Sequence, residues 1–348
     1  MLELLFFANI ATITAGLVMA TTNIKRESLI FFSLVVITVQ SIIIGLRDPL
    51  MMTDTREYVA LFYGSSGFED QIEPFFMALL YSIRFFTERV DVFLIILAII
   101  LNVLYFIFIY SIVGRYALLA FGLFGSTFIY WLVHVQIIRS GLASILLLIC
   151  ISLLANKKIR RGVLFFALSI GTHFSIGVIS IGVFLGYMFS RPNIKRAAVT
   201  LAVLIIAFLA YEFAAPNIPF LAPWKRRLDA YAYYAETEFI QSSFGYMYAY
   251  FVVILAGFLA SWKRQDEKTK FLFNIYMGVV ILSFMFWFNI LYRDRVFAFA
   301  QLMEPLLLMQ LFMNNFGRKG GALVTFAFGI LTSSFVIFVW GPRTVLLF

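Results

Sequence analysis

Long apolar runs separated by short polar segments dominate this chain of 348 residues. The runs are continuous, whereas the strands of a membrane β-barrel alternate apolar and polar residues. A helix needs about 20 apolar residues to cross a bilayer, so the pattern predicts an all-α polytopic membrane protein with about ten transmembrane helices. The predicted spans are 3–21, 28–45, 91–113, 117–134, 137–155, 197–213, 244–262, 270–291, 296–315 and 321–340.

Two apolar segments depart from the pattern. The run 162–190 is long for one span and short for two, and His173 lies near its middle. We expect a re-entrant segment or a hairpin of two short helices that meet near His173. Residues 73–87 are too short to span comfortably, and they predict a helix at the outer face.

Composition supports this fold class. The chain is 63% hydrophobic and 13% charged, whereas soluble domains contain about 25% charged residues. No polar stretch is long enough for a second core, so residues 1–348 are expected to form a single membrane domain. The first apolar run lacks a basic leader and is interpreted as the first span rather than a signal peptide.

The basic residues predict the orientation, because cytoplasmic loops are enriched in Lys and Arg. If Lys25 and Arg26 lie inside, the N-terminus lies outside and the other inside loops are also strongly basic. The scheme requires 162–190 to enter and leave on the same side. It also explains the net charge of +9 without a nucleic-acid partner.

The predicted outer face carries ten arginines and only one lysine. Arginine is the side chain that recognises phosphate and carboxylate groups with two parallel hydrogen bonds. We expect the outer segments 46–90 and 214–243 to form a substrate cavity. The tyrosines of the second segment are interpreted as an interfacial belt or as surfaces for sugar faces.

Several short motifs resemble the EpsG-like branch of the Wzy-type polysaccharide polymerases, and together they cover nearly the whole chain. The matching motifs are Gly45-Leu46-Arg47 leading to Asp54 and Tyr58, Glu73-Pro74-Phe75-Phe76, Arg139-Ser140-Gly141-Leu142-Ala143, His173-Phe174-Ser175, and Arg295 ahead of an apolar segment.

The resemblance implies a membrane glycosyltransferase that polymerises undecaprenyl-diphosphate-linked oligosaccharide repeat units into O-antigen, capsule or exopolysaccharide. It would act at the outer face of the bacterial inner membrane, facing the periplasm or the outside, and its partners can include a chain-length regulator protein. A transporter or flippase of the lipid-linked oligosaccharide and a membrane acyltransferase acting on polysaccharide remain alternatives.

A leaving diphosphate needs preorganised cations. The candidate substrate-binding residues are Arg47, Tyr58, Arg139, Arg226, Arg227, Arg293 and Arg295. Other interpretations stay open, because Arg139 can extend to the interface and Arg293 and Arg295 can pair with Asp294 or Glu304.

The acceptor hydroxyl needs a base, and the candidate catalytic residues are His173, Asp54 and Glu73. His173 can instead stabilise a broken helix, Asp54 can cap a helix, and Glu73-Pro74 is also typical of a helix start. Arginines near His173 would favour its neutral form and a role as base. His134 lies at the end of a span and is expected at the interface.

The chain contains no recognisable metal-binding spacing, since its two histidines are far apart and it has no acidic Asp-Xaa-Asp pair. Its glycine pairs do not match a phosphate-binding fingerprint. We therefore expect neither a metal nor another cofactor.

The predicted orientation can be tested by cysteine labelling. A cysteine replacing Tyr231 should react with an impermeant reagent added from outside, whereas one replacing Asp266 should not, because 266 lies in a basic inside loop. The reverse labelling pattern would refute both the orientation and the outer-face site.

Overall fold

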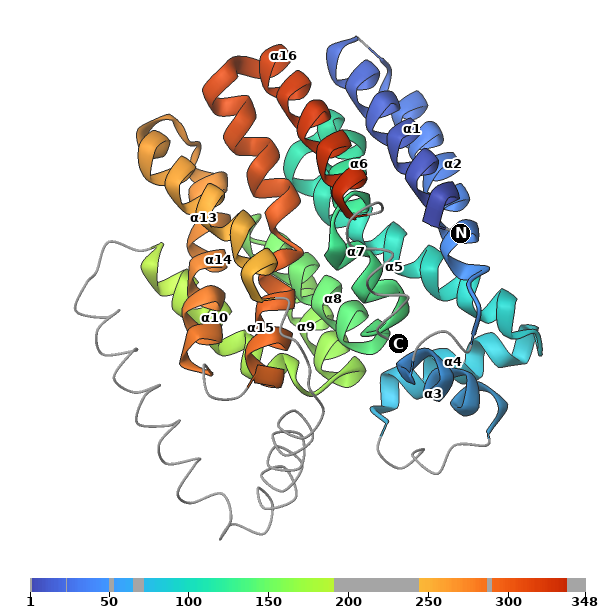
Figure 1. Ribbon diagram of the computed structural model, residues 1–348. Helices are drawn as coiled ribbons and strands as arrows, with labels where there is room; N and C mark the ends of the chain where they lie inside the picture. The colour runs from blue at the N-terminus through green and yellow to red at the C-terminus, as the bar shows by residue number, and fades with distance from the viewer. Residues whose placement is uncertain are drawn as a thin grey trace, which may run out of the picture. The chain divides into compact units, whose positions relative to one another are not determined.

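The computed structural model describes residues 2–22, 24–49, 53–64, 72–190, 244–286 and 290–336, and these ranges are helical throughout apart from their connections (Figure 1). The all-α prediction is therefore confirmed. The chain forms two compact units, with Met1–Ile176 and Leu308–Phe348 in unit 1 and Gly177–Leu307 in unit 2. The single membrane domain that we expected stays a prediction.

The helices of unit 1 are α1 (Leu2–Thr21), α2 (Arg26–Gly45), α3 (Thr53–Tyr63), α4 (Pro74–Phe86), α5 (Val90–Val113), the 3₁₀-helix η2 (Gly114–Tyr116), α6 (Ala117–Gly125), α7 (Phe128–Val135), α8 (Ile138–Ala155) and α9 (Ile159–Thr172). Unit 2 contains α10 (Ile176–Phe189), α13 (Phe244–Ser261), the 3₁₀-helix η4 (Trp262–Arg264), α14 (Glu267–Met285) and α15 (Ile290–Gln301). α16 (Glu304–Phe335) begins in unit 2 and continues into unit 1.

The described residues contain five helical segments long and apolar enough to cross a membrane, or six if one bent pair forms a single span. The chain is therefore a polytopic membrane protein. The segments are Glu3–Thr21, Arg26–Gly45, Val90–Gly125, Ile138–Ala155 and Glu267–Met285, and the bent pair is Tyr292–Gln301 with Glu304–Phe335. The predicted span 197–213 lies outside the described residues, and helix breaks shorten others.

One break divides the predicted span 117–134 into α6 and α7 at Ser126 and Thr127. The Ser126 hydroxyl donates to the carbonyl of Gly122, and the Thr127 hydroxyl donates to that of Phe124. Such side-chain bonds compete with helical backbone bonds. The amide of Asn9 in α1 donates to the carbonyl of Gly125, so this carbonyl has a partner despite the break.

A second break falls inside the predicted span 296–315, at Leu302 and Met303, and the helices on either side are bent by 41°. Proline explains its place, because Pro305 has no N–H to donate to the carbonyl of Gln301. The segment that we predicted as one span is therefore divided by a bend between two helices.

The predicted break near His173 is confirmed. α9 ends at Thr172 and α10 begins at Ile176, while His173 has an extended backbone with φ −161° and ψ 118°. The predicted outer helix 73–87 is also confirmed as a helix, α4, with Pro74 in its first turn.

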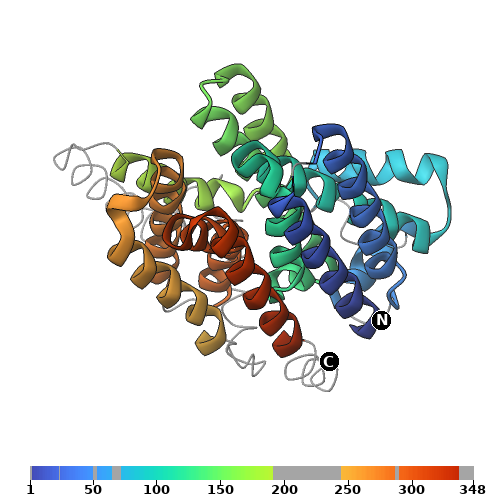
Figure 2. The same ribbon diagram turned by 90° about the horizontal axis from the view of Figure 1, so that it is seen from above.

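α1 packs against α2 and α6 within unit 1, and α5 packs against α2 and α8 (Figures 1 and 2). Near the start of α5, the ring of Phe93 stacks on Phe62 of α3, with ring centroids 4.5 Å apart. Gly45 at the end of α2 lies against Ile95. This end of unit 1 therefore brings together the end of α2, α3 and the start of α5.

The opposite end of α5 meets basic connections. The guanidinium of Arg26 lies 5.8 Å from the ring of Tyr110, and the hydroxyls of Ser111 and Ser152 are hydrogen-bonded near the ends of α5 and α8. The α1–α2 connection, η2 and the end of α8 thus share one end of unit 1. This grouping agrees with the basic loops predicted to lie inside, and which end is cytoplasmic stays a prediction.

Within unit 2, α10 and α14 approach each other closely through glycine. A Cβ atom on Gly278 would collide with the backbones of Gly182 and Gly186. Small residues at such crossings allow membrane helices to pack by close van der Waals contact.

We expect Gly278→Ala to destabilise unit 2 by about 1–3 kcal/mol, because the added methyl group forces two helix backbones apart. Gly177→Ala in α10 is the matched control, since nothing lies within 4 Å of its Cβ position. Thermal unfolding in detergent measures both. Equal melting temperatures would contradict the close contact between α10 and α14.

Candidate functional site

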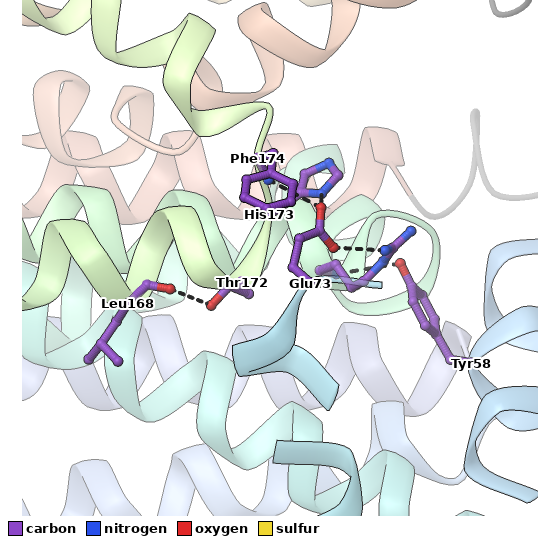
Figure 3. Close-up of polar contacts among 7 residues, drawn as sticks. Tyr58, Glu73, Leu168, Thr172, His173 and Phe174 are labelled. Atoms are coloured by element: carbon purple, nitrogen blue, oxygen red, sulfur yellow. Dashed lines mark hydrogen bonds and ion pairs between the residues drawn. The ribbon is translucent and has the colours of Figure 1, made fainter. Parts of the chain in front are cut away.

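Three candidate residues from distant parts of the sequence meet in unit 1. One carboxylate oxygen of Glu73, Oε2, accepts from Nη1 of Arg139 at 2.9 Å. Its other oxygen, Oε1, lies 2.7 Å from Nδ1 of His173. Figure 3 shows the Glu73 carboxylate directed at the His173 ring. We call Glu73, Arg139 and His173 the acid–base centre.

Local structure places each member of the centre at a helix end. Glu73 precedes α4 with an extended backbone, and Pro74 begins the helix. Arg139 lies in the first turn of α8, and His173 follows α9. α9 packs against both α4 and α8, so the three helix ends converge.

The side chain of Glu73 does not cap its own helix. Its Oε1 also accepts from the backbone N–H of Phe174 at 3.1 Å. This bond satisfies a backbone group that the break after α9 would otherwise leave without a helical partner. Glu73 therefore supports the break as well as the charges around it.

Tyr58 joins the centre from α3. Its ring lies 5.8 Å from the guanidinium carbon of Arg139, a cation–π distance. One turn earlier, the hydroxyl of Thr55 donates to the carbonyl of Val135 at the end of α7. α3 thus contacts the α7–α8 connection at two points and helps to fix the position of Arg139.

Burial of Glu73 acts to raise its pKa, but the hydrogen bond from His173 and the positive charges of His173 and Arg139 outweigh this effect, so its pKa is held below the ordinary value of 4.5. The carboxylate is therefore ionised at neutral pH. We expected arginines to disfavour the charged imidazole of His173. The contact with Glu73 corrects that expectation, because a carboxylate stabilises an imidazolium.

Arg47 is a second buried cation of unit 1, 4% exposed. Burial lowers its pKa to about 10, so it remains charged at neutral pH. Its Nη1 donates to the carbonyl of Ile44 at 3.0 Å, and no acidic partner occurs within the described ranges. An arginine in this state favours an anionic ligand.

His134 is buried within unit 1, in the last turn of α7, and its expected position at the membrane interface stays a prediction. Its Nδ1 lies 2.7 Å from the carbonyl of Tyr130 one turn earlier. The ring lies close to that of Tyr130 in a tilted arrangement, with centroids 4.3 Å apart. The packing of α7 therefore gives His134 a structural role.

Arg293 and Arg295 belong to unit 2. The Nε of Arg293 donates to Asp294 at 2.9 Å, so the predicted alternative of an Arg293–Asp294 salt bridge is confirmed. Glu304 instead accepts a hydrogen bond from the Tyr276 hydroxyl at 2.9 Å. Arg293 is 4% exposed.

Other candidates cannot be placed. Arg226, Arg227 and the segment 214–243 lie outside the described residues. Asp54 falls in the first turn of α3, which begins at Thr53, and its side chain lies outside the description. In the described part of the chain, no three His, Cys, Asp or Glu side chains gather closely enough to hold a metal ion.

Buried amides form a polar network that we did not predict. Nε2 of Gln40 donates to Asn9 at 2.9 Å and to Thr12 at 2.8 Å, and Nδ2 of Asn102 donates to Ser41 at 2.9 Å. Each of these amides interrupts an apolar run, the same signal that identified His173. Their partners lie on α1 and α2, beside the α6–α7 break.

The acid–base centre should make the folded protein less stable to unfolding in acid than at neutral pH. Because the pKa of Glu73 is depressed, its ion pairs stabilise the fold above pH 4.5 and are lost as pH falls through the folded-state pKa. At pH 7 we expect Glu73→Gln to lower the melting temperature in detergent, and the difference from the unmodified protein to shrink below pH 4.5.

Glu88→Gln is the control, because Glu88 is exposed in the α4–α5 connection. It should leave the melting temperature unchanged at both pH values. A destabilisation by Glu73→Gln that persists unchanged in acid would argue against the ion pairs.

Comparison with known proteins identifies the family of this chain. Neither the curated proteins nor the solved structures include a match to this chain. The model of the EpsG family matches residues 29–344, which include Arg47, Glu73, Arg139, His173 and Arg293. The chain belongs to the EpsG family and is a polytopic membrane protein linked to exopolysaccharide synthesis.

Proposed function

We propose that this protein is a Wzy-type polymerase that joins undecaprenyl-diphosphate-linked oligosaccharide repeat units into O-antigen, capsule or exopolysaccharide. The acid–base centre carries the proposal, because it combines an arginine, a carboxylate and an imidazole at helix ends. Glycosyl transfer from a lipid diphosphate requires a cation that stabilises the leaving group and a base that accepts the proton of the acceptor hydroxyl.

The reaction forms one bond and breaks one. A hydroxyl oxygen of the acceptor sugar attacks the anomeric carbon of the donor glycan, and the bond from that carbon to the phosphate oxygen breaks. The electron pair leaves with undecaprenyl diphosphate, and the hydroxyl proton passes to a base. Cations near the leaving group stabilise the charge that develops on it.

The proposed roles follow from this chemistry. Arg139, with Arg293 or Arg295, binds the diphosphate, while Arg47, Tyr58, Arg226 and Arg227 contribute to substrate binding. The buried charge of Arg47 supports its proposed role in substrate binding, because Arg47 has no acidic partner within the described ranges. His173, Asp54 and Glu73 are the candidates for the base.

The place of the reaction is part of the proposal. A lipid diphosphate has its head group at the membrane interface, so the centre would lie at the outer face of the bacterial inner membrane. In α8 the centre lies at the end that carries Arg139, and Ser152 lies near the opposite end, next to the basic connections. A chain-length regulator protein is a further proposed partner.

A flippase for the same lipid-linked oligosaccharide is the second candidate. The breaks at Ser126–Thr127 and Leu302–Met303 favour it, because discontinuous helices are typical of transporters. The convergence of Glu73, Arg139 and His173 favours the transferase, since glycosyl transfer must remove a proton from the acceptor hydroxyl and movement of the lipid across the membrane removes none from its substrate. The acyltransferase alternative uses a histidine but gives no role to the arginines.

The arginine assignment predicts the behaviour of Arg139→Lys, Arg293→Lys and Arg295→Lys. Lysine keeps the charge and loses the planar group that binds phosphate with two bonds. We expect each variant that contacts the diphosphate to form polymer at least tenfold more slowly, a loss of about 1.4 kcal/mol in transition-state binding. Gel analysis of glycans made by purified protein from lipid-linked repeat units measures the rate.

Arg89→Lys is the matched control, because the Arg89 side chain is 75% exposed and pairs with Asp91. Normal polymer from all three test variants would refute phosphate recognition at these positions.

In the same assay, longer glycans on the lipid support the polymerase, movement across liposomes without elongation supports the flippase, and acylated sugar supports the acyltransferase.

A further inference from the structure

The hydrogen bonds of Glu73 use both of its carboxylate oxygens. Oε2 accepts from Arg139 at 2.9 Å, and Oε1 accepts from the Phe174 backbone at 3.1 Å and contacts Nδ1 of His173 at 2.7 Å. The side chain is only 6% exposed. A general base must reach the hydroxyl whose proton it takes, and Glu73 is turned towards protein groups instead.

His173 has the complementary arrangement. A carboxylate oxygen can only accept, so the Nδ1 that contacts Glu73 carries the hydrogen. In the neutral ring, Nε2 then holds the lone pair that can take a proton. The His173 side chain is 15% exposed, more than that of Glu73. The ring is therefore fixed in one tautomer with its basic nitrogen on the side away from the carboxylate.

We infer that Glu73 is a positioning residue of the proposed polymerase, which holds His173 as the base and Arg139 as a diphosphate ligand through one shared carboxylate. The inference rests on the proposed function, and it selects His173 as the base among the three candidates. The acceptor hydroxyl gives its proton to Nε2 of His173 as its oxygen bonds to the anomeric carbon. Glu73 stabilises the imidazolium that results and does not take the proton itself.

The shared carboxylate also couples donor binding to proton transfer. In unit 1, the described contacts connect His173 to Glu73 before α4, Glu73 to Arg139 on α8, and Arg139 to the ring of Tyr58 on α3. A diphosphate bound at Arg139 adds negative charge next to the imidazole. That charge favours the imidazolium, so His173 becomes a stronger base when the donor is in place.

Nuclear magnetic resonance of ¹⁵N-histidine tests the pairing without an activity assay. The chain has only two histidines, His134 and His173, and His173→Gln assigns their signals. We expect the His173 titration midpoint to fall by about one pH unit or more in Glu73→Gln, because an opposite charge next to the ring is lost. Glu73→Asp should retain most of the shift, and Glu88→Gln should match the unmodified protein.

His134 provides an internal control in the same spectra. It is buried and bonded to the Tyr130 carbonyl, so its signal should not titrate near neutral pH. An unchanged His173 midpoint in folded Glu73→Gln would overturn the inference, whatever the activity.

The pH profile of polymer formation tests the roles. With His173 as base, activity falls as pH drops through its midpoint, and Glu73→Gln should move this acid limb to lower pH. The maximal rate should fall roughly 10²- to 10⁴-fold when His173 is replaced by glutamine. A merely structural role for Glu73 would lower the amount of active protein without moving the limb.

Three results would count against the inference. Full polymerisation by folded His173→Gln together with loss in Glu73→Gln would make Glu73 the base. Activity that is lost with rising pH would make His173 a cationic donor. An unchanged acid limb in active Glu73→Gln would remove the positioning role. Absence of glycan elongation by the unmodified protein would instead refute the proposed function, while the midpoints still report the Glu73–His173 pair.

Discussion

The ion pairs of Glu73 are the interaction on which the converging helix ends of unit 1 depend. A carboxylate with so little exposure is costly in an apolar protein unless cations and N–H donors surround it. Arg139, His173 and the Phe174 backbone supply these partners. The start of α4, the start of α8 and the end of α9 must therefore stay together, and the same contacts orient the groups that the proposed chemistry uses.

The helix breaks are subject to the same requirement, namely that buried polar groups of a membrane protein have hydrogen-bond partners. A break exposes backbone carbonyls and amides, which need partners where water is absent. Asn9 bonds the carbonyl of Gly125 at the α6–α7 break, and Glu73 bonds the amide of Phe174 after α9. In both cases a side chain from another helix replaces the missing helical bond, so tertiary packing and local irregularity stabilise each other.

The charged side chains at the two ends of unit 1 are held in different ways. At one end, Arg26 contacts Tyr110 beside connections that contain lysine and arginine. At the other, Arg139 is held between Glu73 and the ring of Tyr58. The first arrangement needs only positive charge near a membrane surface. The second fixes the direction of a guanidinium group, which matters when a ligand must be bound in one orientation.

The sequence alone determined the local features of this protein. Continuous apolar runs require helices in a bilayer, Pro74 marks the start of α4, and the polar interruption at His173 marks the break between α9 and α10. It also selected Arg139 and His173 as candidates, since polar groups in such runs need a reason to be there, and Glu73 as a carboxylate that can act as a base. The breaks inside 117–134 and 296–315 were not predicted, although Ser126-Thr127 and Pro305 interrupt the apolar runs there, because a span was assigned from the mean character of about 20 residues.

Only the tertiary structure decided which candidates meet. Glu73 is 100 residues from His173 and 66 from Arg139 along the chain, and apolar patterns do not specify which helix ends converge. The same packing buries His134 among neighbouring side chains. A side chain's neighbours set its protonation and its hydrogen bonds, and those neighbours come from helix packing rather than from adjacent residues in the sequence.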